Sequence, residues 1–191
     1  MKILLLNGSP HVQGTTKRAL LECRMELSRL DDDPILYDIG PDARHSCISC
    51  GACSRSQGCA YSDIDELISL FSECNGYIIG TPTHYGLASG ALLSVLSRIA
   101  RVMRAKLSGK PVAAVAVGRR GALSEAEADV LRPFRFTGSI IINASYPSIA
   151  YGKDPSSLES DAEGLMNMRS IAAAMHRFLR SGASQPKLNP F

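Results

Sequence analysis

The sequence lacks any long hydrophobic run and any low-complexity tract. No stretch approaches the roughly 20 apolar residues that a membrane-spanning helix needs. The four-residue apolar run at residues 3–6 is too short for the apolar region of a signal peptide. We therefore expect a cytoplasmic protein that does not associate with membranes.

Neither sign of charge is in large excess overall, since the formal net charge is only +3. Aromatic residues do not alternate with the basic ones as they would on a nucleic-acid-binding surface, so we expect no nucleic-acid partner. The basic excess lies in the second half of the chain, where it forms either a solvated helix face or a surface for an acidic carrier or a phosphorylated ligand. Its members are Arg98, Arg101, Arg104, Lys106, Lys110, Arg119, Arg120, Arg132 and Arg135.

A chain of 191 residues with 45% hydrophobic content is the size of one globular domain with a full core. We expect that domain over residues 1–181, followed by a tail at 182–191. Continuous apolar runs predict strands at residues 2–7, 34–39, 76–80, 111–117 and 139–143. Amphipathic patterns predict helices at 15–29, 64–72, 89–106, 125–134 and 162–180. This alternation predicts an α/β fold, a doubly wound five-stranded parallel sheet with helices on both faces.

In such sheets, ligands bind at the loops that leave the carboxyl ends of the strands. The first of these loops combines glycines with hydroxyl side chains, ahead of a helix that begins near Thr15. Unpaired N–H groups and the positive end of that helix suit a phosphate dianion. The loop has neither a dinucleotide fingerprint nor a P-loop ending, which favours a terminal monophosphate. The alternative is a plain strand-to-helix turn with a threonine N-cap. The residues involved are Ser9, His11, Gly14, Thr15 and Thr16.

The loop after the third strand places an aromatic ring and an imidazole beside proline and glycine, a stiff wall against which a flat ring system can pack. Its residues are Pro82, Thr83, His84, Tyr85 and Gly86. The loop after the fourth strand, which begins with Gly118 and Arg119, would either close this pocket or form a basic surface turn.

Four of the six cysteines lie within thirteen positions, at Cys47, Cys50, Cys53 and Cys59. Disulfides are disfavoured in a reducing compartment, so a metal or redox site is the better interpretation. The compact spacing is closer to an iron–sulfur run than to two separated zinc knuckles, which favours a [4Fe–4S] cluster. Zinc binding or free thiols remain alternatives. The other two cysteines, Cys23 and Cys74, are expected to be buried apolar residues.

These motifs together resemble the iron–sulfur flavoproteins, a branch of the flavodoxin-like NADPH-dependent FMN reductases. The resemblance runs from Met1 to about Leu179. Besides the cysteine run, it rests on the turn at Gly8, Ser9 and Pro10, on Asp63 at a helix start, on the loop from Thr81 that leads to Arg98, and on residues 136–138 before the last strand.

The resemblance implies a bound FMN, with its phosphate on the first loop and its ring against residues 82–86, and a cluster ligated by the four cysteines. It implies an FMN-dependent NAD(P)H oxidoreductase whose electron donor is a nicotinamide cofactor or ferredoxin and whose acceptor is a small molecule. A homodimer or homotetramer is expected on the same basis.

Three alternatives remain open. The chain would act as a flavodoxin-like electron carrier or redox-sensing module without turnover, or as a flavin reductase that lacks the cluster. A dehydrogenase for one small metabolite is the third alternative, and the segment at 144–161 would then shape the substrate pocket.

Overall fold

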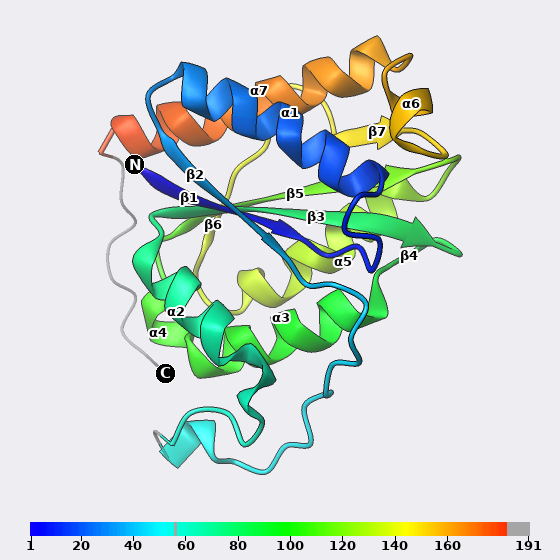
Figure 1. The fold of residues 1–191 in the computed structure, drawn as a ribbon. Coiled ribbons are helices and arrows are strands. Elements are labelled where there is room, and N and C mark those ends of the chain that lie inside the picture. The colour runs from blue at the N-terminus through cyan, green and yellow to red at the C-terminus, as the bar shows by residue number, and fades with distance from the viewer. Residues whose placement is uncertain (56, 183–191) are drawn as a thin grey trace.

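The computed structural model describes residues 1–55 and 57–182, so most of the expected tail at 182–191 lies outside the described residues. Parallel strands form the centre of the fold in the order β2-β1-β3-β5-β6 (Figure 1). They are β1 (Lys2–Asn7), β2 (Asp33–Asp38), β3 (Gly76–His84), β5 (Pro111–Gly118) and β6 (Ile140–Ile141). The predicted α/β fold and its five parallel strands are confirmed.

The middle residues of the central strands are apolar because both faces of the sheet are covered. The β1 residues Ile3 to Leu6 are fully buried. Across the sheet, Leu5 of β1 lies beside Ile78 of β3, which in turn lies beside Ala113 of β5. Continuous apolar runs therefore predicted these strands correctly.

Two short strands bring the sheet to seven strands, which corrects the predicted number. A tight hairpin folds β4 (Leu87–Ala88) antiparallel onto the end of β3. Along the outer side of β5, at the edge of the sheet, β6 pairs with the start of β5 and β7 (Ile149–Tyr151) pairs with its end. The chain between β6 and β7 leaves the edge of the sheet. Strands of two or three residues are too short to give an apolar run.

Helices cover both faces of the sheet (Figure 1). One face carries α1 (Thr15–Arg29), α7 (Ala162–Arg180) and the short α6 (Pro155–Leu158). The other carries α2 (Asp65–Glu73), α3 (Gly90–Val102), α4 (Arg104–Leu107) and α5 (Leu123–Arg135). Two 3₁₀ turns, Cys53–Arg55 and Ser62–Ile64, lie in and just after the cysteine-rich loop.

The helices α1 and α7 have the predicted boundaries, but the helix predicted over 89–106 is interrupted. Met103 leaves helical geometry, with φ −107° and ψ 12°, and it separates α3 from α4. The Met103 side chain is 2% exposed. Because Met103 is apolar and buried, it continues the amphipathic pattern across the break, so the sequence predicted one helix.

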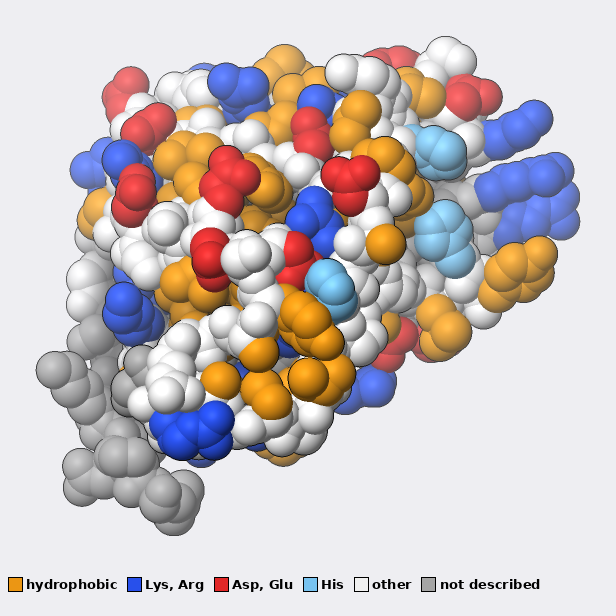
Figure 2. Space-filling model, turned by 60° about the horizontal axis from the view of Figure 1, so that its bottom comes forward, with side chains coloured by type: hydrophobic (Ala, Val, Ile, Leu, Met, Phe, Trp, Pro, Cys, Tyr) orange, Lys and Arg blue, Asp and Glu red, His pale blue; other side chains and the backbone are white. Residues whose placement is uncertain are grey.

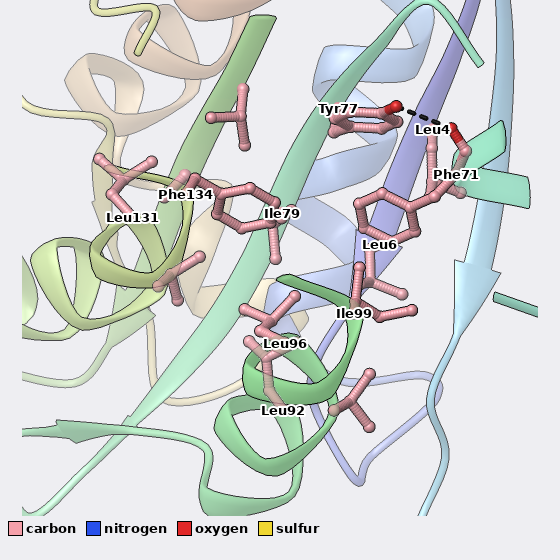
Figure 3. Close-up of a cluster of buried hydrophobic side chains, with 14 of the residues drawn as sticks. Leu4, Leu6, Phe71, Tyr77, Ile79, Leu92, Leu96, Ile99, Leu131 and Phe134 are labelled. Atoms are coloured by element: carbon pink, nitrogen blue, oxygen red, sulfur yellow. Dashed lines mark hydrogen bonds between the residues drawn. The ribbon is translucent and has the colours of Figure 1, made fainter. Parts of the chain in front are cut away.

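Each face of the sheet has its own core. On the α3 side, the rings of Phe71, Tyr77 and Phe134 pack together, and the Tyr77 hydroxyl donates to the Phe71 carbonyl at 2.7 Å (Figure 3). Cys74 is buried on this side, and Cys23 on the other, as predicted. Burial raises the pKa of the Cys23 thiol, which keeps it protonated.

The strand order reverses direction between β1 and β3, because β2 lies to one side of β1 and the later strands to the other. This is the position at which open α/β sheets bind ligands. Among residues 1–55 and 57–182, no helix combines the length and apolar character needed to cross a membrane.

Candidate functional site

A cavity of about 400 Å³ opens at the carboxyl ends of β1, β3 and β5. It brings together every residue predicted to hold a cofactor except Tyr85 and Gly86. The lining comprises the predicted Ser9, His11, Gly14, Thr15, Thr16, Pro82, Thr83, His84, Gly118 and Arg119, together with Val117 and residues 152–155.

The first loop is folded by its own backbone and side chains. The Ser9 amide donates to Asn7 Oδ1 at 3.1 Å, and the His11 amide donates to Ser9 Oγ at 3.1 Å. Gly14 donates to the His11 carbonyl at 2.9 Å and is the N-cap of α1, without a side-chain cap. The start of α1 therefore offers N–H groups to the cavity, as a phosphate site requires. The alternative of a threonine N-cap is not found, because Gly14 occupies the N-cap position.

Gly14 is required by close packing within this loop. A Cβ atom at this position would lie 2.9 Å from the His11 carbonyl oxygen, closer than real Cβ atoms approach. Any side chain at position 14 would therefore push the loop out of its fold.

Asn7 and Asp38, at the ends of β1 and β2, hold the loop through hydrogen bonds. Sequence reasoning did not identify either as a site residue. Asn7 is fully buried and donates from Nδ2 to Asp38 Oδ1 at 2.8 Å. Lys17 forms an ion pair with the other oxygen of Asp38 at 2.7 Å. Lys17, the lysine of α1, is thus paired with a carboxylate. The loop offers backbone amides and hydroxyl groups as hydrogen-bond donors.

The opposite wall comes from the ends of β3 and β5. Thr83 Oγ1 is buried and has no hydrogen-bond partner within the described chain. A ligand in the cavity would give it one, which fits a polar cofactor. Gly118 allows β5 to approach, since a Cβ there would lie 3.2 Å from Thr83 Cβ.

Tyr85 and Gly86 lie outside the lining, in the hairpin between β3 and β4. Both have positive φ angles, 52° and 82°, as a tight hairpin turn requires. The Tyr85 side chain is fully exposed. Their predicted contact with a ring system remains a prediction.

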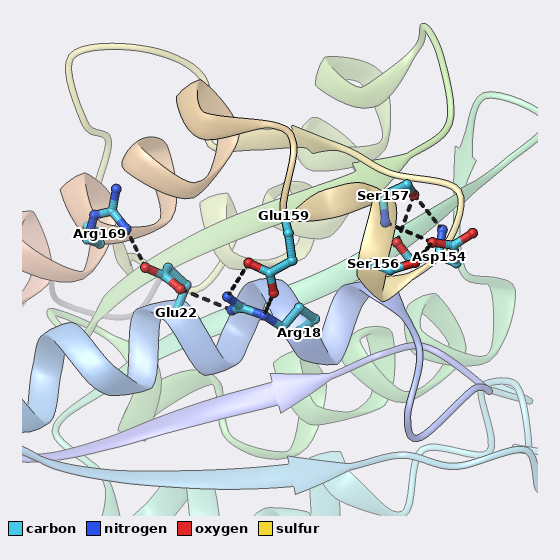
Figure 4. Close-up of polar contacts among 7 residues, drawn as sticks. All are labelled: Arg18, Glu22, Asp154, Ser156, Ser157, Glu159 and Arg169. Atoms are coloured by element: carbon cyan, nitrogen blue, oxygen red, sulfur yellow. Dashed lines mark hydrogen bonds and ion pairs between the residues drawn. The ribbon is translucent and has the colours of Figure 1, made fainter.

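The segment at 152–155 forms a further wall, and sequence reasoning placed it only within the longer segment at 144–161. Asp154 caps α6: its carboxylate accepts from the Ser157 amide at 2.8 Å and from the Ser156 hydroxyl at 2.8 Å (Figure 4). These bonds lower the pKa of Asp154. The cap holds the wall at the mouth of the cavity.

An ion-pair network ties this wall to α1 and α7 (Figure 4). Arg18 donates to Glu159, just after α6, at 2.5 and 3.1 Å, and to Glu22 at 3.0 Å. Glu22 is 6% exposed and also pairs with Arg169 of α7. The pKa of Glu159 is lowered by its bond to Arg18.

A second candidate site lies on the far side of α3, where the cysteine-rich loop projects from the body (Figure 1). The thiols Cys47, Cys50, Cys53 and Cys59 line one small cavity of about 30 Å³. Positive φ angles at Ser49, Gly51 and Gly58 curl the chain around it. A set of four sulfur donors suits a thiolate-bound metal group, and the ligation of such a group by these cysteines remains a prediction.

The thiols do not form a closed coordination shell in this arrangement. Within the described residues, no group of three His, Cys, Asp or Glu side chains is placed to hold a metal ion. Cys47 and Cys50 are exposed, and the neighbouring side chain of Cys53 raises the pKa of Arg101.

A larger groove of about 790 Å³ adjoins the loop between α3 and α5. It is lined by Cys53, Arg101, Arg104, Arg132 and the 75% exposed Phe136, among others. Figure 2 shows the lower side of the molecule turned forward, where hydrophobic side chains lie beside Lys and Arg side chains. The predicted basic face is therefore present in part.

Arg98 does not belong to that face, which corrects the prediction. It is 2% exposed and forms an ion pair with Asp63 at 2.7 Å. Charge counting along the sequence cannot detect a pair whose members are 35 positions apart. The sequence indicated that these two residues matter only through the family resemblance, which rests in part on both of them.

Comparison with known proteins gives a consistent identification. Residues 1–154 match the NADPH-dependent FMN reductase family. An iron-sulfur flavoprotein of Methanocaldococcus jannaschii is 26% identical over 181 residues, covering 90% of this chain and 93% of that protein. An iron-sulfur flavoprotein of Archaeoglobus fulgidus is 29% identical over 118 residues, covering 60% of this chain and 58% of that protein.

Solved structures agree on the fold. A flavone reductase superposes with a TM-score of 0.73 at 15% identity, over 94% of this chain and 63% of that one. An archaeal flavodoxin superposes with a TM-score of 0.64 at 11% identity, over 94% of this chain and 99% of that one. The fold is therefore flavodoxin-like. From its match over residues 1–154, the chain belongs to the NADPH-dependent FMN reductase family and is an FMN-dependent oxidoreductase.

Proposed function

We propose that this oxidoreductase takes electrons from NAD(P)H through FMN and passes them to a small acceptor, with a [4Fe–4S] cluster on Cys47, Cys50, Cys53 and Cys59 as a one-electron relay. The observation that carries this proposal is the coexistence of two cavities on one domain. One is the polar cavity at the strand ends, and the other is lined by the four thiols. We place that domain at residues 1–181.

For FMN, the proposed phosphate contacts are Ser9, His11, Gly14, Thr15 and Thr16, from the loop whose amides and hydroxyls face the cavity. The ring would pack against residues 82–86 and against Gly118 and Arg119. When bound, the flavin accepts a hydride and releases single electrons, chemistry that no side chain of the pocket supplies. The protein residues bind it, orient it and supply the unpaired Thr83 hydroxyl as a hydrogen-bonding group.

For the cluster, support comes from the thiol geometry and from the names of the relatives. The Methanocaldococcus and Archaeoglobus relatives are called iron-sulfur flavoproteins. The four thiols line one cavity together with Arg98 and Arg101. Cys47, Cys50 and Cys53 follow one another at two-residue gaps, a compact spacing that an iron–sulfur cluster can use.

The two donors would use different surfaces. A nicotinamide cofactor would approach the open side of the flavin cavity, where Arg119 offers a positive charge to a phosphate. Ferredoxin would instead meet the groove of Arg101, Arg104 and Arg132 beside Cys53. By resemblance, we propose a homodimer or homotetramer as the working form.

The exposure of Cys47 and Cys50 supports one alternative, a redox-sensing module whose thiols react directly. Such a module would hold FMN without turning over a nicotinamide donor. The two functions therefore differ in how the bound flavin responds to NAD(P)H.

The test mixes FMN-loaded protein with NADPH and separately with NADH under argon and follows the flavin absorbance by stopped flow. Rapid bleaching by either donor is expected, and the faster one identifies the cofactor. Failure to bleach with both, while dithionite still reduces the flavin, would contradict the reductase and favour a carrier or sensor.

A further inference from the structure

Both ends of the cysteine-rich loop meet at one buried guanidinium group. Arg98 of α3 donates to Asp63 Oδ1 from its two terminal nitrogens, at 2.7 and 2.8 Å. One of these nitrogens also donates to the His45 carbonyl at 3.1 Å. Because His45 precedes the first cysteine of the loop and Asp63 follows the last, a single side chain connects both ends to α3.

Aromatic contacts reinforce the same point. The rings of His45 and Tyr61 stack with centroids 3.9 Å apart and planes 9° apart. The guanidinium carbon of Arg98 lies 5.8 Å from the Tyr61 ring centroid, within reach of a cation–π interaction. Arg44 donates to the Asp63 carbonyl at 3.0 Å and to the Ile39 carbonyl just beyond β2. We call Arg44, His45, Tyr61, Asp63 and Arg98 the neck of the loop.

Between its ends, the loop is held by weaker means. Its backbone bonds are short in range, from Ser54 to Gly51 at 3.2 Å and from Arg55 to Ala52 at 3.0 Å. A hydroxyl contact joins Ser46 to Ser94 of α3 at 3.2 Å. The strong, buried contacts of this region are therefore concentrated in the neck.

We propose that Asp63 and Arg98 are positioning residues for the thiol site. Their ion pair holds the loop closed against α3, so that the four thiols face one cavity before any metal group binds. Closing the loop in advance removes an entropy cost that binding would otherwise have to overcome. The inference rests on the proposed function, because it gives the neck the task of preparing the proposed cluster site.

Arg98 also forms part of the wall of that cavity. Its Nε is buried and lacks a hydrogen-bond partner in the part of the chain that the structure describes. The side chain therefore brings an unused N–H donor to the cavity, which suits a sulfur acceptor.

The test measures amide hydrogen exchange by mass spectrometry on metal-free, FMN-loaded protein, comparing wild type with Asp63→Asn and Arg98→Lys. Asp63→Asn preserves shape and removes the charge, whereas Arg98→Lys preserves the charge and lacks the planar group that donates to Asp63 from two nitrogens. We expect exchange across residues 45–61 to rise by about tenfold or more in both variants. Exchange in β1, β3 and β5, and FMN affinity, should stay near wild type.

Glu22→Gln is the matched control, since it converts another buried, arginine-paired acid into an amide on the opposite face of the sheet. It should increase exchange in α1 and α7 and leave residues 45–61 unchanged. Equal loop exchange in wild type, Asp63→Asn and Arg98→Lys would overturn the proposal. So would a rise spread evenly over the whole chain, which indicates general destabilisation.

A second readout is iron and sulfide retained after anaerobic reconstitution. The variants should lose iron several times faster than wild type and than Glu22→Gln, while Arg98→Lys keeps more iron than Arg98→Met. Wild-type protein that takes up no iron would refute the proposed cluster and leave the exchange result intact. The two hypotheses can therefore fail separately.

Discussion

The cavity proposed for the flavin and the cysteine-rich loop are built in opposite ways. The cavity lies on the ends of buried parallel strands, and its loops are fixed by bonds such as Gly8 N–H to the Gly80 carbonyl at 2.8 Å. The cysteine loop projects from the sheet and is fixed mainly at its two ends. A site formed at strand ends has its shape before its ligand arrives. A site on a projecting loop depends on how the ends are held and on the ligand itself.

Cys50→Ser should have the largest effect, and it should change the cysteine-rich loop without changing the cavity proposed for FMN. A hydroxyl is a poor ligand for iron compared with a thiolate, so we expect iron per chain to fall by more than half while FMN per chain is unchanged. Metal analysis and the flavin absorbance of anaerobically purified protein check this.

Cys23→Ala is the matched control, because Cys23 is a buried thiol of the α1 side that donates to the Met168 carbonyl at 3.3 Å. It should leave iron unchanged and lower the free energy of unfolding by about 1 kcal/mol. Iron loss in Cys23→Ala, or normal iron in Cys50→Ser, would show that the cysteine loop is not the metal site.

Gly14→Ala should have the next largest effect, now on the flavin region alone. The added Cβ would lie 2.9 Å from the His11 carbonyl oxygen and displace the phosphate loop. We expect FMN affinity to fall by about tenfold or more, a loss of one or two polar contacts. Fluorescence titration of the apoprotein with FMN measures this.

Gly90→Ala serves as its control, since a Cβ on this first residue of α3 meets nothing within 4 Å. Its FMN affinity should equal that of wild type. Unchanged affinity in Gly14→Ala would rule out residues 9–16 as the phosphate site.

Glu159→Gln should have a smaller effect on the same cavity. It removes the ion pair with Arg18 that ties the wall at 152–155 to α1. We expect FMN affinity to fall by about threefold at low salt, and the difference to shrink at high salt because exposed pairs are screened. Titrations at two salt concentrations check this, and a difference that ignores salt would contradict the ion-pair explanation.

Glu127→Gln should have the smallest effect and should depend on pH. Burial raises the pKa of Glu127, whose carboxylate accepts from the Ser148 amide at 3.3 Å beside β7. A raised pKa means that this group's contribution to stability is complete below its unfolded pKa and is lost as pH rises through the folded value. The variant should therefore raise the Tm slightly at pH 8 and not at pH 4. A larger gain at pH 4 would contradict the sign.

The same contrast explains what the sequence could predict. Strands β1, β3 and β5, and the position of the loop at residues 8–14 at the cavity, follow from local patterns, namely apolar runs and a loop rich in glycine and hydroxyl groups. The wall at 152–155 could not be located, because its position depends on β7 pairing with β5, a contact of three residues.

The contacts of the neck could not be predicted from the sequence for a related reason. Arg98 resembles its exposed neighbours Arg101 and Arg104 in sequence, and only the fold brings it to Asp63. The cysteine spacing predicted that four thiols converge, but spacing carries no information on how tightly the loop holds them. That property belongs to contacts between distant residues.

Metal and cofactor analysis of protein purified without oxygen decides whether the four cysteines hold an electron relay beside FMN. Iron, zinc, acid-labile sulfide and FMN are measured per chain, together with the visible spectrum. We expect about four irons, four sulfides and one FMN per chain. One FMN with zinc or with no metal would contradict the relay and leave a flavin reductase whose four thiols serve another purpose.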